Sequence, residues 1–197
     1  MKNPQTVAEK LYQQFPSLKL KSIKDYSCCA LVLIWCCGLD LEDYEAIITV
    51  GQMMDKGVIA QDCSVYWSQA CEFLTGRKLT VDFKDITSIK GIKERTPVRF
   101  DYHGKSHWVG VEKGKIAFNS LEHSNCVENG KPVTARILKF SGVKNESKKY
   151  KSFNQNNFNR GWLCFVYPAL VRDPSRSRDK RNMAVNRLCL RGRAWNN

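Results

Sequence analysis

Two segments of the sequence carry residue types that can perform nucleophilic chemistry. The first, Asp25 to Gly38, reads DYSCCALVLIWCCG, and the second, Ser106 to Leu121, reads SHWVGVEKGKIAFNSL. The first places a thiol where a helix is predicted to begin, and the second places His107 where a strand is predicted to begin. A thiolate is a far better nucleophile than a thiol, and both the positive end of a helix and a nearby imidazolium favour it. The two segments together predict a cysteine-nucleophile hydrolase.

The element that must position the thiol is a buried helix. The run from Cys28 to Cys37 is apolar on every side, Asp25 and Ser27 before it are good capping residues, and Gly38 is a natural stop. Free backbone N–H groups in its first turn would lower the pKa of a thiol there and bind an oxyanion. Cys28 is therefore the candidate nucleophile. Free cysteines are often plain core residues, which is the interpretation for the others in this helix: Cys29, Cys36 and Cys37.

The element that must position the histidine is an antiparallel meander, predicted from three short runs rich in Val, Ile and aromatics: Thr96 to Tyr102, His107 to Val111 and Lys115 to Asn119. Two registers are open for its second hairpin. A two-residue turn at Lys113-Gly114 places Ser120 opposite His107, whereas a three-residue loop that also includes Glu112 places Asn119 there. We favour the three-residue loop, because Lys-Gly is a poor two-residue turn. The Asn119 amide oxygen would then accept the ring N–H of His107 and fix its tautomer.

The order Cys28, His107, Asn119 resembles that of the papain-like cysteine peptidase superfamily. The HWVGVE hairpin followed by FNSL is similar to bacteriocin-leader-processing and uncharacterised bacterial or phage papain-like domains, and more distantly to NlpC-type endopeptidases. The resemblance covers roughly Ile23 to Tyr167. It implies an α+β fold in which a buried N-terminal helix carrying the cysteine packs on an antiparallel sheet carrying the histidine and asparagine. It also implies a nucleophile, a general base and an orienting residue that cleave a peptide or amide bond of a peptide or protein substrate without a metal or organic cofactor.

One position departs from that pattern. Papain-like enzymes place an oxyanion-hole glutamine a short distance before the nucleophile, and here that stretch reads KSIKDYS. The nearest upstream glutamines are Gln13 and Gln14, and Ser22 is the substitute that the sequence offers. A missing donor of this kind lowers the rate by about two to three powers of ten. The alternative interpretation is therefore a catalytically inactive papain-like binding module whose basic surface engages nucleic acid or another acidic partner.

Composition sets the outer bounds. The 197 residues fit one domain, predicted over residues 1–170. A basic tail over 171–197, which we expect to be disordered, follows it and holds nearly half of the formal charge of +13. Such a tail predicts weak contact with nucleic acid or another acidic polymer. The nine cysteines are odd in number, include two adjacent pairs and show no C-x-x-C spacing, which indicates free thiols in a reducing compartment. The opening residues lack the apolar core of a secretory signal, and no run is long enough to cross a bilayer, so we expect a cytoplasmic protein without a transmembrane segment.

The remaining segments yield coarser predictions. Helices are expected over Leu41 to Lys56 and Val65 to Leu74, and a strand over Val133 to Phe140. The stretch from Val81 to Arg95 is expected to be a solvated connection. The other expected features are a turn-rich loop, a mobile loop and a final buried strand: Cys126 to Pro132, Asn145 to Arg160, and Trp162 to Tyr167.

Overall fold

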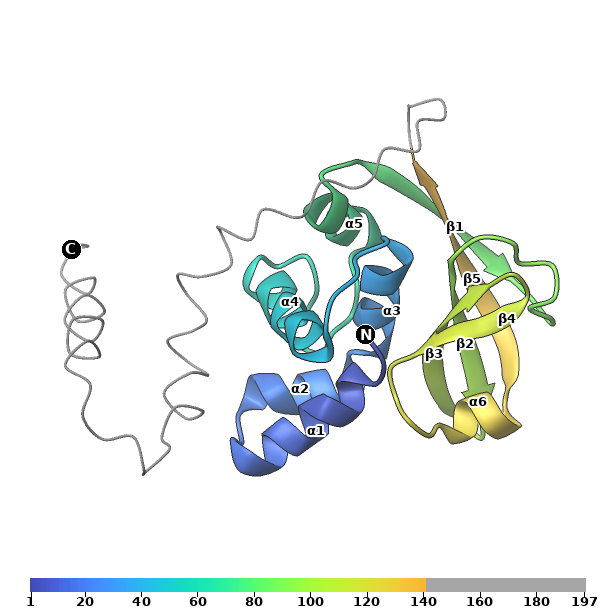
Figure 1. Ribbon diagram of the computed structural model, residues 1–197. Helices are drawn as coiled ribbons and strands as arrows, with labels where there is room; N and C mark the ends of the chain where they lie inside the picture. Colours follow the sequence, from blue (N-terminus) through green and yellow to red (C-terminus); the bar gives the residue numbers. More distant parts are fainter. Residues whose placement is uncertain (141–197) are drawn as a thin grey trace, which may run out of the picture. The chain divides into compact units, whose positions relative to one another are not determined.

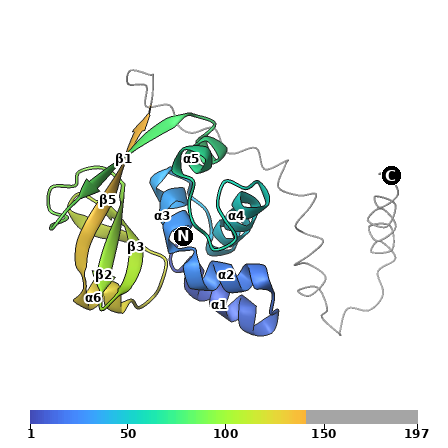
Figure 2. The same cartoon turned by 180° about the vertical axis from the view of Figure 1, so that it is seen from behind.

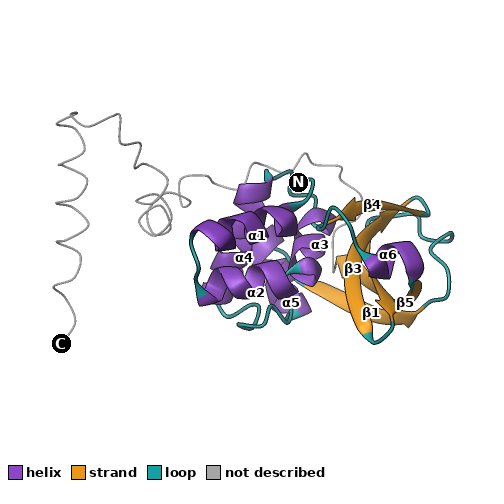
Figure 3. Cartoon of the chain, turned by 90° about the horizontal axis from the view of Figure 1, so that it is seen from below, coloured by secondary structure: helices purple, strands orange, loops and turns teal. Residues whose placement is uncertain are grey.

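The computed structural model describes residues 1–140 of the chain, and these form an α+β fold with a layer of helices beside an antiparallel sheet (Figure 1). The same two layers are seen from behind in Figure 2 and along the layer boundary in Figure 3. The coarse fold class predicted from the sequence is therefore confirmed. The predicted loop at 145–160, the strand at 162–167, the domain end at 170 and the basic tail lie outside the described residues.

Six helices occur in the described part: α1 Pro4–Gln14, α2 Leu18–Tyr26, α3 Cys28–Cys36, α4 Asp43–Asp55, α5 Trp67–Thr75 and α6 Asn125–Asn129. Their ends follow local sequence signals. Ser17 accepts the N–H of Leu20 at the start of α2, and Glu42 and Glu45 form a capping box at the start of α4. Gly76 ends α5 in the left-handed conformation that glycine adopts without strain.

Five antiparallel strands form the sheet in the order β1-β5-β2-β3-β4. Their bounds are β1 Leu79–Asp85, β2 Thr96–Tyr102, β3 Lys105–Glu112, β4 Lys115–Asn119 and β5 Lys131–Phe140. Side chains alternate across each strand, so the sheet has two buried faces. One face packs on the helices through residues such as Trp108 and Phe118, and the other forms a second core around Val98, Phe100 and Val109.

Helix α3 lies between the other helices and the sheet (Figure 1) and is seated on β3 through an aromatic side chain. The ring of Trp35 stacks on Phe118 of β4 with centroids 5.9 Å apart. It also lies so close to Gly110 that a Cβ there would be 2.5 Å from a ring carbon. Because any side chain at Gly110 would push Trp35 away, this glycine sets the distance between α3 and β3.

Three coarse predictions are wrong. Val81 to Asp85 belongs to β1 rather than to a solvated connection, because it pairs with β5, which follows much later in the sequence. The stretch predicted as a turn-rich loop contains α6, a short helix that buries Cys126 against the second core. Ser27 does not cap α3 with its side chain, since α2 ends at Tyr26 and leaves Ser27 with a ψ of 0° instead of the extended backbone of a capping residue.

The predicted register of the β3–β4 hairpin is also wrong in its details. The turn has two residues, Lys113 and Gly114, both at positive φ, and a bulge follows between Ile116 and Phe118. Glycine adopts this conformation without steric strain, and the N–H of Gly114 donates to the carbonyl of Ile92 at 2.7 Å. The bulge places Asn119 opposite Val109, two residues along the same face from His107. Neither register considered from the sequence included a bulge.

Candidate active site

Cys28 is the first residue of α3, one residue after α2 ends. Its side chain is half-buried. The backbone N–H groups of Trp108, Cys29 and Cys28 itself are directed at its sulfur, since all three lower the pKa of the thiol. The Trp108 contact ties the start of α3 to strand β3.

The Trp108 N–H lies at an open place on the sheet. Strand β4 ends at Asn119, which pairs with Val109, so Trp108 is one residue beyond the paired part of β3 on that side. Backbone N–H groups lie in the plane of a sheet, whereas side chains stand above and below it. The Cys28 sulfur is therefore at the sheet edge, next to the residue that directly follows His107.

Burial decides the charge state of the thiol. Desolvation raises the pKa of Cys28 above its usual value of 9.0, and this outweighs the three N–H groups that lower it. Burial raises the pKa of Cys29 and Cys36 much further, because neither has comparable N–H groups. Among these three half-buried thiols, Cys28 is thus the one that loses its proton most readily, although it is neutral near pH 7.

His107 and Asn119 are brought together as the sequence predicted, by the bulge rather than by direct pairing. Nε2 of His107 lies 2.8 Å from Oδ1 of Asn119. The same Oδ1 accepts the backbone N–H of Leu121 at 3.2 Å, which identifies it as the oxygen of the amide. Because an oxygen can only accept, Nε2 carries the proton and Nδ1 is the basic nitrogen of the neutral ring.

The His107 ring is buried, with 5 % of its surface exposed. Burial lowers its pKa below the usual 6.5, and the hydrogen bond to Asn119 opposes this shift only in part. At neutral pH the histidine is therefore an uncharged base. Together with the raised pKa of Cys28, this gives a neutral thiol and a neutral imidazole at rest rather than an ion pair.

A buried glutamine connects the segments that carry these residues, and sequence reasoning missed it. Gln5 of α1 accepts the hydroxyl of Ser120 at 2.9 Å, and its Nε2 donates to the carbonyl of Lys24 at 2.7 Å. Its backbone N–H also donates to the carbonyl of Ser120 at 3.0 Å. Gln5 thus joins α1, the end of α2 just before Cys28, and the residue after Asn119. Spacing along the chain could not reveal it, because it lies outside the window where an oxyanion glutamine is expected.

The two glutamines and the serine that the sequence offered as oxyanion donors do not contact the Cys28 sulfur. Gln13 and Gln14 are exposed at the end of α1, and Ser22 is half-buried within α2. Ser22 offers its carbonyl to the thiol of Cys63 at 3.5 Å. The donors found at the Cys28 sulfur are backbone N–H groups, so an oxyanion formed there would depend on the peptide backbone.

No protein-family model matches the sequence, and no curated protein or solved structure is significantly similar to it. Among residues 1–140, no helix is long and apolar enough to span a membrane. The same residues contain no group of three or more His, Cys, Asp or Glu side chains placed to hold a metal ion. All seven cysteines in this part of the chain are free thiols.

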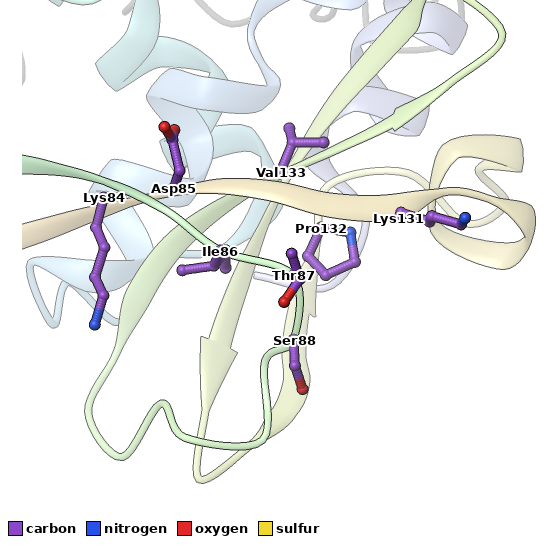
Figure 4. Close-up of a pocket in the computed structure, with 8 residues that line it drawn as sticks. All are labelled: Lys84, Asp85, Ile86, Thr87, Ser88, Lys131, Pro132 and Val133. Carbon is purple, nitrogen blue, oxygen red and sulfur yellow. The ribbon is translucent and has the colours of Figure 1, made fainter.

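A separate hollow of about 640 Å³ lies where β1 ends and β5 begins, lined by residues 84–88 and 131–133 (Figure 4). Lys84 and Asp85 point to opposite sides of the strand, and Lys131 points away from both. Because these polar groups do not converge on one point, the hollow has no defined ligand chemistry. It contains none of the candidate site residues.

Proposed function

We propose that the protein is a thiol-dependent hydrolase of the papain-like type that cleaves a peptide or amide bond through Cys28, His107 and Asn119. The observation that carries the proposal is the position of the Cys28 sulfur at the N–H of Trp108, the neighbour of a histidine whose tautomer is fixed by Asn119. This chemistry requires a nucleophile and a base that a third group orients, and the pairing of His107 with Asn119 supports the second part of that requirement.

In this proposal the proton moves during attack rather than before it. Nδ1 of His107 takes the proton of the Cys28 thiol while the sulfur attacks the carbonyl carbon of the substrate. Backbone N–H groups at the start of α3 hold the oxyanion. The protonated imidazole then gives its proton to the leaving amine, the C–N bond breaks, and a thioester remains on Cys28. Water, deprotonated by His107, attacks the thioester, releasing the acid and restoring the thiol.

Alkylation by iodoacetamide, located by mass spectrometry, tests the proposal. Cys29 and Cys36 are internal controls, because they are half-buried thiols on the same helix. We expect Cys28 to be alkylated faster than both near neutral pH, and His107→Ala to slow the alkylation of Cys28 without changing the rates of Cys29 and Cys36. His103→Ala is the matched control, because His103 is exposed in the β2–β3 turn and should leave the rate unchanged. Equal rates for the three thiols, or an unchanged rate in His107→Ala, would overturn the proposal.

A second candidate function is a papain-like binding module in which Cys28 is a relic. The neutral resting state of Cys28 and His107 favours it, since neither group is charged by the other. The two candidates differ in pH dependence. A hydrolase that uses His107 as a base loses kcat/KM as the pH falls through the lowered pKa of His107, below 6.5, whereas a binding module shows no turnover of peptides at any pH.

A further inference from the structure

Arg136 of β5 lies within a cluster of aromatic rings close to Cys28. Its guanidinium carbon is 3.9 Å from the ring centre of Phe83, 5.0 Å from that of Trp108 and 5.8 Å from that of Trp67. We call these four residues the Arg136 cluster. Phe83, Trp108 and Arg136 come from the sheet and Trp67 from α5, so the cluster spans the boundary between the two layers.

The guanidinium is only partly satisfied. Its Nη1 donates to the hydroxyl of Thr134 at 2.8 Å and to the carbonyl of Ala135 at 3.3 Å. Its Nε is buried and has no hydrogen-bond partner, and no carboxylate within residues 1–140 forms a salt bridge with it. Its neighbour Arg99, in contrast, pairs with Asp101 at 3.0 Å. A buried cationic donor without an acceptor is costly. Nη2 is not enclosed and makes no hydrogen bond within residues 1–140, so a carboxylate can meet the guanidinium there with a charge-assisted hydrogen bond.

The cluster is adjacent to the candidate nucleophile. Trp108, whose ring lies against Arg136, is the residue whose backbone N–H contacts the Cys28 sulfur. The charge of Arg136 also acts on Cys29, the next residue of α3. Phe83 is 66 % exposed, so the cluster reaches the surface of the described part. A chain lying across Cys28 can therefore place a side group against Arg136.

We propose that the Arg136 cluster is a subsite that binds a carboxylate of the substrate, with Arg136 as the anion donor and the three rings as its walls. Calling the ligand a substrate rests on the proposed hydrolase function, but the binding itself requires no catalysis. The carboxylate comes either from an acidic side chain or from the C-terminus of a peptide. Both have the same chemistry at Arg136, and small probes distinguish them.

The test uses the full chain carrying Cys28→Ser, which separates binding from turnover. Three probes are titrated while the indole and arginine Nε–H signals are followed by NMR: N-acetylglutamate N-methylamide, N-acetylalanine and the uncharged N-acetylglutamine N-methylamide. We expect the uncharged probe to bind at least about tenfold more weakly than the better of the two carboxylates, the change expected from losing a charge-assisted hydrogen bond. Tighter binding of N-acetylglutamate N-methylamide would identify an acidic side chain as the ligand, and tighter binding of N-acetylalanine would identify a C-terminal carboxylate. Equal binding of all three probes overturns the proposal.

Variants locate the binding. Arg136→Gln should weaken the binding of the better carboxylate by about tenfold or more. Arg136→Lys, which keeps the charge but loses the planar guanidinium, should weaken this binding less. Arg95→Gln is the matched control. Arg95 lies 4.6 Å from the ring centre of Trp35 and pairs with Glu112, so this substitution removes an equal charge from another arginine–tryptophan stack. An equal loss in Arg95→Gln and the Arg136 variants overturns the proposal. If Arg136→Gln does not fold, the probe ranking and Arg136→Lys decide.

The outcome is separable from that of the hydrolase proposal. Carboxylate binding at Arg136 without enhanced alkylation of Cys28 would leave an anion site and remove the hydrolase. Enhanced alkylation without discrimination between the probes would leave the hydrolase and remove the subsite.

Discussion

Replacement of Gln5 by leucine should cost more stability than any other glutamine replacement on the described helices. Gln5 is 3 % exposed, and its amide satisfies both the hydroxyl of Ser120 and the carbonyl of Lys24. Ser120 is fully buried, so neither water nor another side chain can easily replace the lost acceptor. An unsatisfied buried group costs about 1–3 kcal/mol, and two such groups give an expected loss of about 2–5 kcal/mol.

Urea unfolding followed by circular dichroism measures this loss, and a double-mutant cycle isolates its source. In a Ser120→Ala background there is no hydroxyl to leave unpaired. Gln5→Leu should therefore cost less stability there than in the unmodified protein, by about 1 kcal/mol or more. Gln52→Leu is the matched control, because Gln52 is a half-buried glutamine of α4 and should change stability by only about 0.5 kcal/mol. The reasoning is refuted if Gln5→Leu costs the same in both backgrounds, or no more than Gln52→Leu.

Three further outcomes are expected. Gly110→Ala should destabilise the fold by about 1–3 kcal/mol in urea, because the new Cβ would overlap the ring of Trp35, and a neutral result would show that α3 can shift freely. Ser27→Ala should raise the melting temperature, because the Ser27 hydroxyl is buried without a hydrogen-bond partner, and a clear decrease would reveal a partner that the structure does not contain. Asn119→Ala should lower the pKa of His107 in an NMR titration of the ring, because the hydrogen bond that raises this pKa is lost and burial continues to lower it; an upward shift would contradict this account of the site.

The elements nearest the site were predictable because their signals are local. The all-apolar run that forms α3, the glycine turns of the meander and the bounds of β2 and β4 follow from neighbouring residues alone. The association of His107 with Asn119 was also predicted, although for an incorrect reason. A bulge shifts every side chain beyond it by one position, and no composition or turn preference in FNSL indicates where a bulge occurs.

The parts that could not be predicted depend on partners distant in the sequence. β1 carries charged residues on an exposed surface, and only its pairing with β5 makes it a strand. The role of Gln5 depends on Ser120, which is 115 residues away. The Arg136 cluster likewise draws single residues from α5 and three strands, none of which forms a motif with the others in sequence. Packing between layers, rather than local preference, creates these features.

The junction of α2 and α3 bears on what a nucleophilic role of Cys28 would require. A helix that follows a loop presents its positive end to a first-turn cysteine, but here the negative end of α2 lies one residue before Cys28 and opposes it. Burial adds to this effect and keeps the thiol protonated at rest. The N–H groups of Trp108, Cys29 and Cys28 lower the pKa of the thiol but do not compensate for its burial. Any nucleophilic role of Cys28 therefore requires a base that takes the proton during attack, and the tautomer fixed by Asn119 leaves Nδ1 of His107 as the nitrogen available for it.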